Sequence, residues 1–253
     1  MTTSTAPPAA PMLQEWKRLA AGGPPPEPFD PDMVVDLPEP ARRWLAHAIA
    51  PGTPLWRSVE LEMHGTIKIK GWRPFTATQV IAPPEGYIWA ARASVYGLPV
   101  TGYDRLSSGS GEMRWRLLGV VPVVTASGPD LFRSAAGRLA SEIALLPTAF
   151  QMAAWRLGDA PDTAVATWQI GAESIDVALH VAPDGRLLDV LLQRWSDAGG
   201  AFGYVPFGVA CEQERTFDGV TIPSDIRAGW WWGTDREAEG AFFRAEITSA
   251  THR

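Results

Sequence analysis

The alternation of apolar and polar residues changes its period near residue 58. From there Val59, Leu61 and Met63 occupy odd positions, and polar residues stand between them. Because successive side chains of a strand point to opposite faces, this pattern predicts a long strand over 59–69 with one buried face. Further strand-like segments follow between short turns rich in Gly, Pro and Ser, as an antiparallel meander requires. We expect them at 75–81, 87–95, 100–106, 112–118, 164–170, 174–181, 187–195, 209–217, 221–232 and 241–248.

Helical spacing occurs in three places. Residues 12–21 predict a short helix, and "LPEPARRWLAHAIAPG" over 37–52 predicts another, with Pro40 in its first turn. Residues 129–157 interrupt the strands, because Phe132, Leu139 and Ile143 recur at helical spacing. Prolines are concentrated before residue 41, and the segment "GGPPPEPFDPD" over 22–32 can neither continue a helix nor join a ladder. We therefore divide the chain into a Pro-rich tail with a short helix over 1–36, loose over 1–11, and a single curved β-sheet domain over 37–253.

The number of strands determines the predicted architecture. About eleven strands exceed the roughly six of an ordinary sheet. A twisted sheet of this width tends to curl, and curling gives it an inner face. We predict a mainly β fold: one strongly curved antiparallel sheet, a half-barrel or barrel, with a central helical insertion over 129–157 and an N-terminal helical segment. Two packed sheets are the main alternative.

Composition narrows the class of protein. With 253 residues, 46% of them hydrophobic and 20% charged, the chain can bury a large core. A net charge of −6 without a basic cluster argues against nucleic acid as a partner. One cysteine and four scattered histidines favour neither a disulfide nor a metal site. No secretory leader or membrane-spanning apolar run is evident, so we expect a cytoplasmic protein without a membrane span.

Tryptophan is the unusual component. In a strand, Trp230 and Trp232 would share one face and Trp231 would take the other. Seven of the twelve tryptophans lie in predicted strands: Trp89, Trp115, Trp168, Trp195, Trp230, Trp231 and Trp232. For any single one an aromatic core is the simpler interpretation, but indoles pack poorly at high density, and each buried N–H needs a partner. The set therefore favours a cavity with flat apolar walls. We assign five residues to these walls: Trp89, Trp115, Trp230, Tyr103 and Trp195.

Two carboxylates are candidates for acid–base chemistry. Asp104 follows Tyr103 in a predicted strand, and Glu142 borders the apolar stripe of the central helix. In a dry cavity, a carboxyl has a raised pKa and can act as a general acid or base. Alternatively, Glu142 pairs with Arg138 one turn earlier, and Asp104 closes a turn.

Three arginines have ambiguous positions. Arg114 and Arg116 form either a solvated outer face, which we favour, or a charged lining of the cavity. Arg194, beside Trp195, has the same ambiguity.

The order of several short motifs resembles an uncharacterised bacterial domain family. The motifs are "LPEPARRWL" (37–45), "GWRPFTATQ" (71–79), "WAA" (89–91), "GYDRLSSGSGEM" (102–113), "RLASEIALLPTA" (138–149), "PDGR" (183–186) and "GVTIPSDIRAGW" (219–230). Together they cover about residues 37–250. That family is similar to the curved half-barrels of bacterial lipoprotein carriers, which hold acyl chains in an apolar trough. The resemblance implies a bent sheet and no particular reaction, and it ranks Asp104 and Glu142 first because they lie within its motifs.

Two main functions are compatible with these features. The first is a cofactor-independent cyclase or isomerase that folds a polyketide or terpenoid-like intermediate in a Trp-lined cavity, with Glu142 and Asp104 as acid and base. The second is a non-catalytic protein that binds a lipid or another hydrophobic ligand. A third possibility, a structural or partner-binding module, predicts a solid core. We expect a hydrophobic small molecule as the partner and no metal or cofactor.

Overall fold

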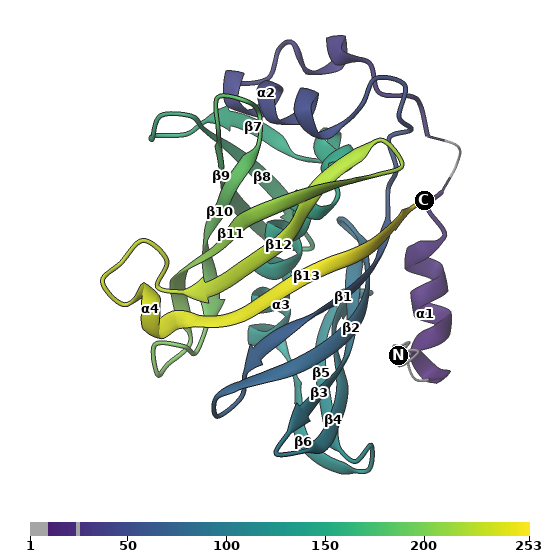
Figure 1. Ribbon diagram of the computed structural model, residues 1–253, viewed down its shortest axis with the longest axis vertical. Coiled ribbons are helices and arrows are strands. Elements are labelled where there is room, and N and C mark those ends of the chain that lie inside the picture. Colours follow the sequence, from purple (N-terminus) through teal and green to yellow (C-terminus); the bar gives the residue numbers. More distant parts are fainter. Residues whose placement is uncertain (1–9, 24–25) are drawn as a thin grey trace.

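The computed structural model describes residues 10–23 and 26–253 (Figure 1). These residues form one antiparallel sheet of thirteen strands, in the order β6-β5-β4-β3-β2-β1-β13-β12-β11-β10-β9-β8-β7. The order follows the chain in two limbs, β1–β6 and β7–β13, which join where β1 pairs with β13. The strands are β1 (Val59–Lys68), β2 (Trp72–Ala82), β3 (Gly86–Val95), β4 (Leu98–Ser107), β5 (Ser110–Leu117), β6 (Val121–Ser127), β7 (Ala154–Leu157), β8 (Thr163–Ile170), β9 (Glu173–Val181), β10 (Leu187–Ser196), β11 (Gly203–Phe217), β12 (Val220–Trp230) and β13 (Ala241–His252).

All eleven predicted strands are present, and β6 and β7 are additional. Both are edge strands, each paired on one side only. Strand β6 ("VPVVTAS") is exposed at nearly every position and therefore lacks alternation. Strand β7 has only four residues and lies inside the region predicted as helical. Pairing with a neighbour, rather than a pattern of their own, makes these two segments strands.

The helix α3 (Pro129–Ser141) shows how strongly the sheet bends. It packs against β4, β5 and β6 of the first limb and against β8, β9 and β10 of the second. Strands β5 and β10 are second and tenth in the sheet, so they would lie about 38 Å apart if the sheet were flat. A 13-residue helix is only about 20 Å long. The sheet therefore curls around α3, which confirms the predicted curvature.

The two edge strands show whether the sheet closes into a barrel or remains a half-barrel. Strands β6 and β7 do not pair with each other, so the sheet stays open. All thirteen strands belong to this one sheet, so the alternative of two packed sheets is wrong for the described residues.

The inner side of the curve is filled mainly by the central insertion. After α3 come the 3-10 helices η2 (Glu142–Leu145) and η3 (Pro147–Met152). Leu139, Ile143, Leu146 and Phe150 from these helices join one large core with the inward residues of the strands. The helical region ends before β7, earlier than the predicted boundary at residue 157.

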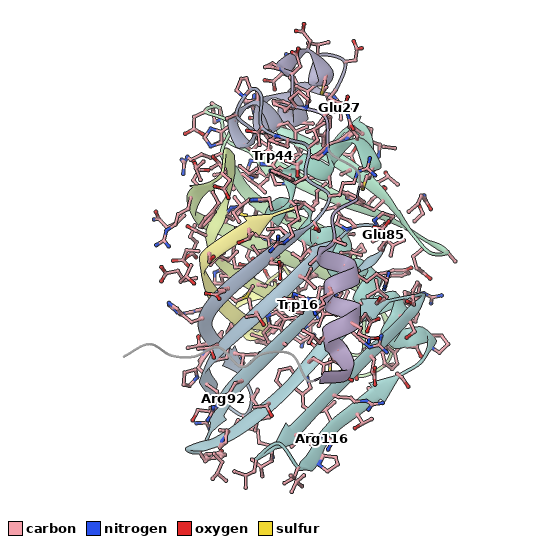
Figure 2. The ribbon with its side chains drawn as sticks, turned by 90° about the vertical axis from the view of Figure 1, so that its right-hand side faces the viewer. Trp16, Glu27, Trp44, Glu85, Arg92 and Arg116 are labelled. Carbon is pink, nitrogen blue, oxygen red and sulfur yellow. The ribbon has the colours of Figure 1, made fainter. Side chains whose placement is uncertain are left out.

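Helix α1 (Ala10–Ala20) lies on the opposite, outer side of the sheet. Its Met12, Trp16 and Leu19 form a small separate core with Val80 and Ile88. The Trp16 Nε1 atom donates a hydrogen bond to Glu60 on β1, 2.7 Å away. Figure 2 looks onto this side and shows α1 with Trp16 in front of the strands. Residues 1–9, most of the predicted loose tail, lie outside the described residues.

The remaining helices lie beside the ends of the strands. The 3-10 helix η1 (Pro31–Val34) and helix α2 (Glu39–Ala48) cap one end, where Trp44 and Leu45 are buried. Helix α4 (Glu237–Gly240) forms a single turn before β13. None of the helices in the described residues is both long and apolar enough to cross a membrane.

The three consecutive tryptophans do not continue a strand. Strand β12 ends at Trp230, and Trp231 has a left-handed backbone with φ of +53°. Trp230 pairs opposite Phe207 on the inner side. Trp232 instead covers the outer side, because a Cβ atom on Gly208 would lie 2.1 Å from its ring. The prediction that Trp230 and Trp232 share one face is therefore wrong, since the turn at Trp231 reverses the direction of the chain.

Candidate functional site

Three charged side chains meet on the inner side of the sheet. Arg138, in the last turn of α3, donates from Nε to Glu142 Oε1 at 2.8 Å and from Nη1 to Asp104 Oδ2 at 3.3 Å. Asp104 reaches this point from the middle of β4, and Glu142 directly follows α3. We call Asp104, Arg138 and Glu142 the Arg138 cluster. The two carboxylates predicted as acid and base are thus brought together by one guanidinium.

Each carboxylate oxygen in the Arg138 cluster has a donor. Trp115 Nε1 donates to Asp104 Oδ1 at 2.8 Å, and Gln79 Nε2 donates to Glu142 Oε2 at 2.8 Å. Buried charges are tolerated when they are paired and hydrogen-bonded in this way. The interpretation that Glu142 pairs with Arg138 is confirmed. The interpretation that Asp104 closes a turn is wrong, because Asp104 lies within β4.

The low-dielectric surroundings shift the pKa values of the cluster. Burial raises the pKa of Asp104 above its ordinary value, although Arg138 and the Trp115 hydrogen bond oppose the shift. Burial alone would lower the pKa of Arg138, but Glu142, Tyr87 and Asp104 outweigh it, and the pKa is raised. Burial also raises the pKa of the Tyr87 hydroxyl. At neutral pH, Arg138 is therefore a fixed cation beside a neutral phenol.

Seven aromatic rings form a continuous path along the inner side. We call them the aromatic arc: Phe75, Trp89, Trp115, Phe207, Trp230, Phe242 and Phe243. Neighbouring ring centroids along this path are 5.1 to 6.5 Å apart, which is within the range of favourable aromatic contacts. The arc crosses from β5 in the first limb to β11 in the second. Trp115, Trp230, Phe242 and Phe243 are only partly buried, so the arc offers apolar surface to a ligand.

Two arginines cover the arc. The guanidinium carbon of Arg138 lies 5.2 Å from the ring centroid of Trp89. That of Arg194, on β10, lies 4.8 Å from Phe207 and 5.1 Å from Trp230. Both are cation–π distances. The ambiguity about Arg194 is resolved, since it belongs to the inner side.

A signal for Arg194 is present in the sequence. Val190, Leu192 and Arg194 alternate along β10, and the first two are buried in the core. A charged residue that continues a buried register is a candidate for the inner face. Sequence reasoning considered only its neighbour Trp195 as a site residue, and so did not rank Arg194.

Two predicted wall residues lie elsewhere. Tyr103 packs against the small core under α1 on the outer side. Trp195 contacts the rings of Phe202 and Tyr204 and donates from Nε1 to Asp130 Oδ1 at 2.8 Å. Tyr103 is the chain neighbour of the inward Asp104, and alternation therefore turns it away from the arc. Trp195 lies near the end of β10 and contacts the first turns of α3 instead of the arc.

Side chains also alternate between the two faces along strand β5. Trp115 faces inward, while Arg114 pairs with Glu112 and Arg116 is exposed. Our favoured interpretation of these arginines as an outer face is confirmed.

A pocket of about 190 Å³ lies apart from the arc, between α2 and β10–β12. His47 and Glu214 line it, with His47 Nε2 2.8 Å from Glu214 Oε1. None of the predicted site residues lines this pocket. Its volume is below the roughly 300 Å³ at which small-molecule sites usually begin. Within the described ranges, no three His, Cys, Asp or Glu side chains gather as metal ligands would.

Comparisons with known proteins give a family and a fold likeness. The sequence model of a family of unknown function, DUF6544, matches residues 27–241. This match confirms the resemblance indicated by the ordered motifs. No curated protein matches the sequence.

Two solved structures are similar to the chain. A LolA superfamily protein from Nitrosomonas europaea has 10% identity and a TM-score of 0.43, covering 95% of this chain and 93% of its own. A domain from Vibrio parahaemolyticus, described as an outer membrane lipoprotein-sorting protein, has 8% identity and a TM-score of 0.42, covering 78% and 86%.

Proposed function

The chain belongs to the DUF6544 family, whose function is unknown, and we propose that it binds a largely apolar small molecule on the aromatic arc. The observation that carries this proposal is the partial exposure of four rings of the arc on the inner side of the sheet: Trp230, Phe242 and Phe243, which contact one another in that order, and Trp115 at the other end. Soluble proteins seldom leave contiguous apolar surface open without a use for it. An acyl chain, a terpenoid or a polyketide would each suit a row of flat rings.

The energetics of such a contact are favourable. Covering about 200 Å² of apolar surface contributes about 5 kcal/mol before the entropic cost of binding is subtracted. Rings fixed by contacts with their neighbours lose little conformational freedom when a ligand arrives. The arc is therefore suited to weak or moderate binding of a range of apolar molecules.

The test compares two neighbouring tryptophans. We expect Trp230→Ala to weaken the binding of decan-1-ol about tenfold or more, because it removes one wall of the arc. Trp232→Ala changes an equally large side chain on the outer side, and it should leave the affinity unchanged. Isothermal titration calorimetry gives both affinities, and Trp230→Leu provides a second variant if the alanine substitution prevents folding. The proposal fails if decan-1-ol does not bind, or if the two positions respond equally.

An acid–base enzyme is the second candidate function. It is favoured by the position of Asp104, whose burial raises its pKa and whose partner Trp115 belongs to the arc. A raised pKa makes the protonated form of a carboxyl more available, and general acid–base catalysis of a cyclisation or isomerisation uses such a group. Asp104 and Glu142 would then act as acid and base, and Trp89, Trp115 and Trp230 would shape the substrate.

Measurement of catalytic turnover distinguishes a ligand-binding protein from an acid–base enzyme. Native mass spectrometry of freshly purified Asp104→Asn protein would identify any trapped compound. If the protein is an enzyme, wild-type protein incubated with that compound should convert it to a product, and Glu142→Gln should slow the conversion. Recovery of the unchanged compound from wild-type protein would leave ligand binding as the function.

A further inference from the structure

Arg194 differs from Arg138 in its partners. Arg138 holds two carboxylates, whereas no carboxylate in the described residues lies within 4.0 Å of Arg194. Arg194 Nε donates to the backbone oxygen of Ser134 at 3.1 Å. In the described part of the chain its two terminal nitrogens have no hydrogen-bond partner, and they are not fully buried. Among the described residues, four N–H groups of this partly buried cation thus have no acceptor.

The surroundings hold this unpaired cation in place. Its guanidinium lies over the rings of Phe207 and Trp230. A Cβ atom on Gly137 of α3 would lie only 3.0 Å from Arg194 Cγ, so the glycine makes room for the side chain. Glycine inside a helix costs about 1 kcal/mol relative to alanine. Helix α3 is therefore less stable with Gly137 than it would be with alanine, and the glycine leaves space for the Arg194 side chain.

Burial makes the unpaired charge costly. Burial, together with the nearby charge of Arg138, lowers the pKa of Arg194 to about 10, although Tyr87, Glu142 and Asp104 oppose the shift. At neutral pH the guanidinium is still charged. A buried cation normally has a counter-ion, because desolvation is otherwise uncompensated.

We propose that Arg194 binds the anionic head of an amphiphilic ligand, a carboxylate, whose apolar body lies on the aromatic arc. This inference rests on the proposed function and specifies its ligand. With Nε occupied, the edge formed by the two terminal nitrogens is free for a bidentate pair with two carboxylate oxygens. Because Phe207 and Trp230 belong to the arc, the ligand body can begin directly beside its head.

The neighbouring charges favour a monoanion. The Arg138 cluster contains one guanidinium and two carboxylates, and both carboxylates are close enough to act on Arg194. Their negative charge repels a second charge on the ligand. A carboxylate therefore fits better than a phosphomonoester, which carries a charge of about −1.5 to −2 at pH 7.

The experiment uses three probes of equal chain length: decanoate and decyl phosphate, titrated below their critical micelle concentrations, and decan-1-ol, titrated below its solubility limit. We expect wild-type protein to bind decanoate about ten- to hundredfold more tightly than decan-1-ol, as a hydrogen-bonded charge pair provides. Arg194→Gln should remove this preference, measured as the ratio of the decanoate and decan-1-ol affinities within the same variant, and Arg194→Lys should retain part of it. Arg244→Gln is the matched control, because Arg244 is exposed and stacks over Trp72 at 4.9 Å.

The outcomes distinguish the two proposals. Absence of decan-1-ol binding contradicts the proposed function itself. Binding of decan-1-ol that depends on Trp230, with decanoate no tighter or unaffected by Arg194→Gln, contradicts the role of Arg194 alone. Tighter binding of decyl phosphate than of decanoate overturns the assignment of a monoanion.

Discussion

Replacing Arg138 by methionine is expected to lower the free energy of unfolding by about 3 to 5 kcal/mol. The substitution removes the common partner of Asp104 and Glu142 and leaves two carboxylates facing each other in a buried site. Neither carboxylate can regain full hydration without opening the contact between α3 and the sheet. Urea denaturation of the variant and the wild type measures the loss.

The matched control removes the two charges as well. In the triple variant Asp104→Asn, Arg138→Met, Glu142→Gln, the amide oxygens can still accept from Trp115 and Gln79. We expect this variant to recover most of the lost stability, since replacing a whole buried ion group is often neutral. A triple variant as unstable as Arg138→Met would show that packing of the arginine, and not its charge, stabilises the site.

Stability is expected to fall by up to about 3 kcal/mol as the pH decreases from 6.5 to 4, because of His252. Both ring nitrogens of His252 are buried and have no hydrogen-bond partner in the described residues. Burial lowers its pKa from 6.5 to about 4. Between these values the unfolded chain binds a proton that the folded protein excludes, so stability is lost as the pH falls and levels off below about pH 4.

The contribution of His252 is isolated by comparing variants across this pH range. His252→Gln should show a flatter dependence of the unfolding free energy on pH than the wild type. His64→Gln, which changes an exposed histidine, is the control and should follow the wild type. Equal slopes for wild type and His252→Gln would contradict the prediction.

Alternation along the chain was sufficient to predict most of the sheet. The segments that follow it, such as β1 and β10, bury one face, and their hydrophobic periodicity reports that burial directly. The edge strands β6 and β7 escaped prediction because their structure depends on a neighbouring strand. The curvature followed from the number of strands, since a wide twisted sheet must bend.

The candidate site was predictable in part. Asp104 and Glu142 stood out as charges next to apolar positions, and the structure brings both to Arg138. Tyr103 was chosen by residue type, although its position next to Asp104 in a strand turns it outward. The meeting of β4, α3 and β10 around one group of charges depends on the bend of the sheet, which local sequence does not encode.

The pairing of β1 with β13 has a consequence for biosynthesis. Val59 lies opposite His252, so the two limbs can be joined only after nearly all of the described chain has left the ribosome. Until then, one edge of the ten-residue strand β1 has no partner and can recruit strands from other nascent chains. Such long-range closure is slow compared with hairpin formation within each limb. Pauses in translation ahead of residue 241 would therefore lengthen the period in which this edge of β1 is open to association with other chains.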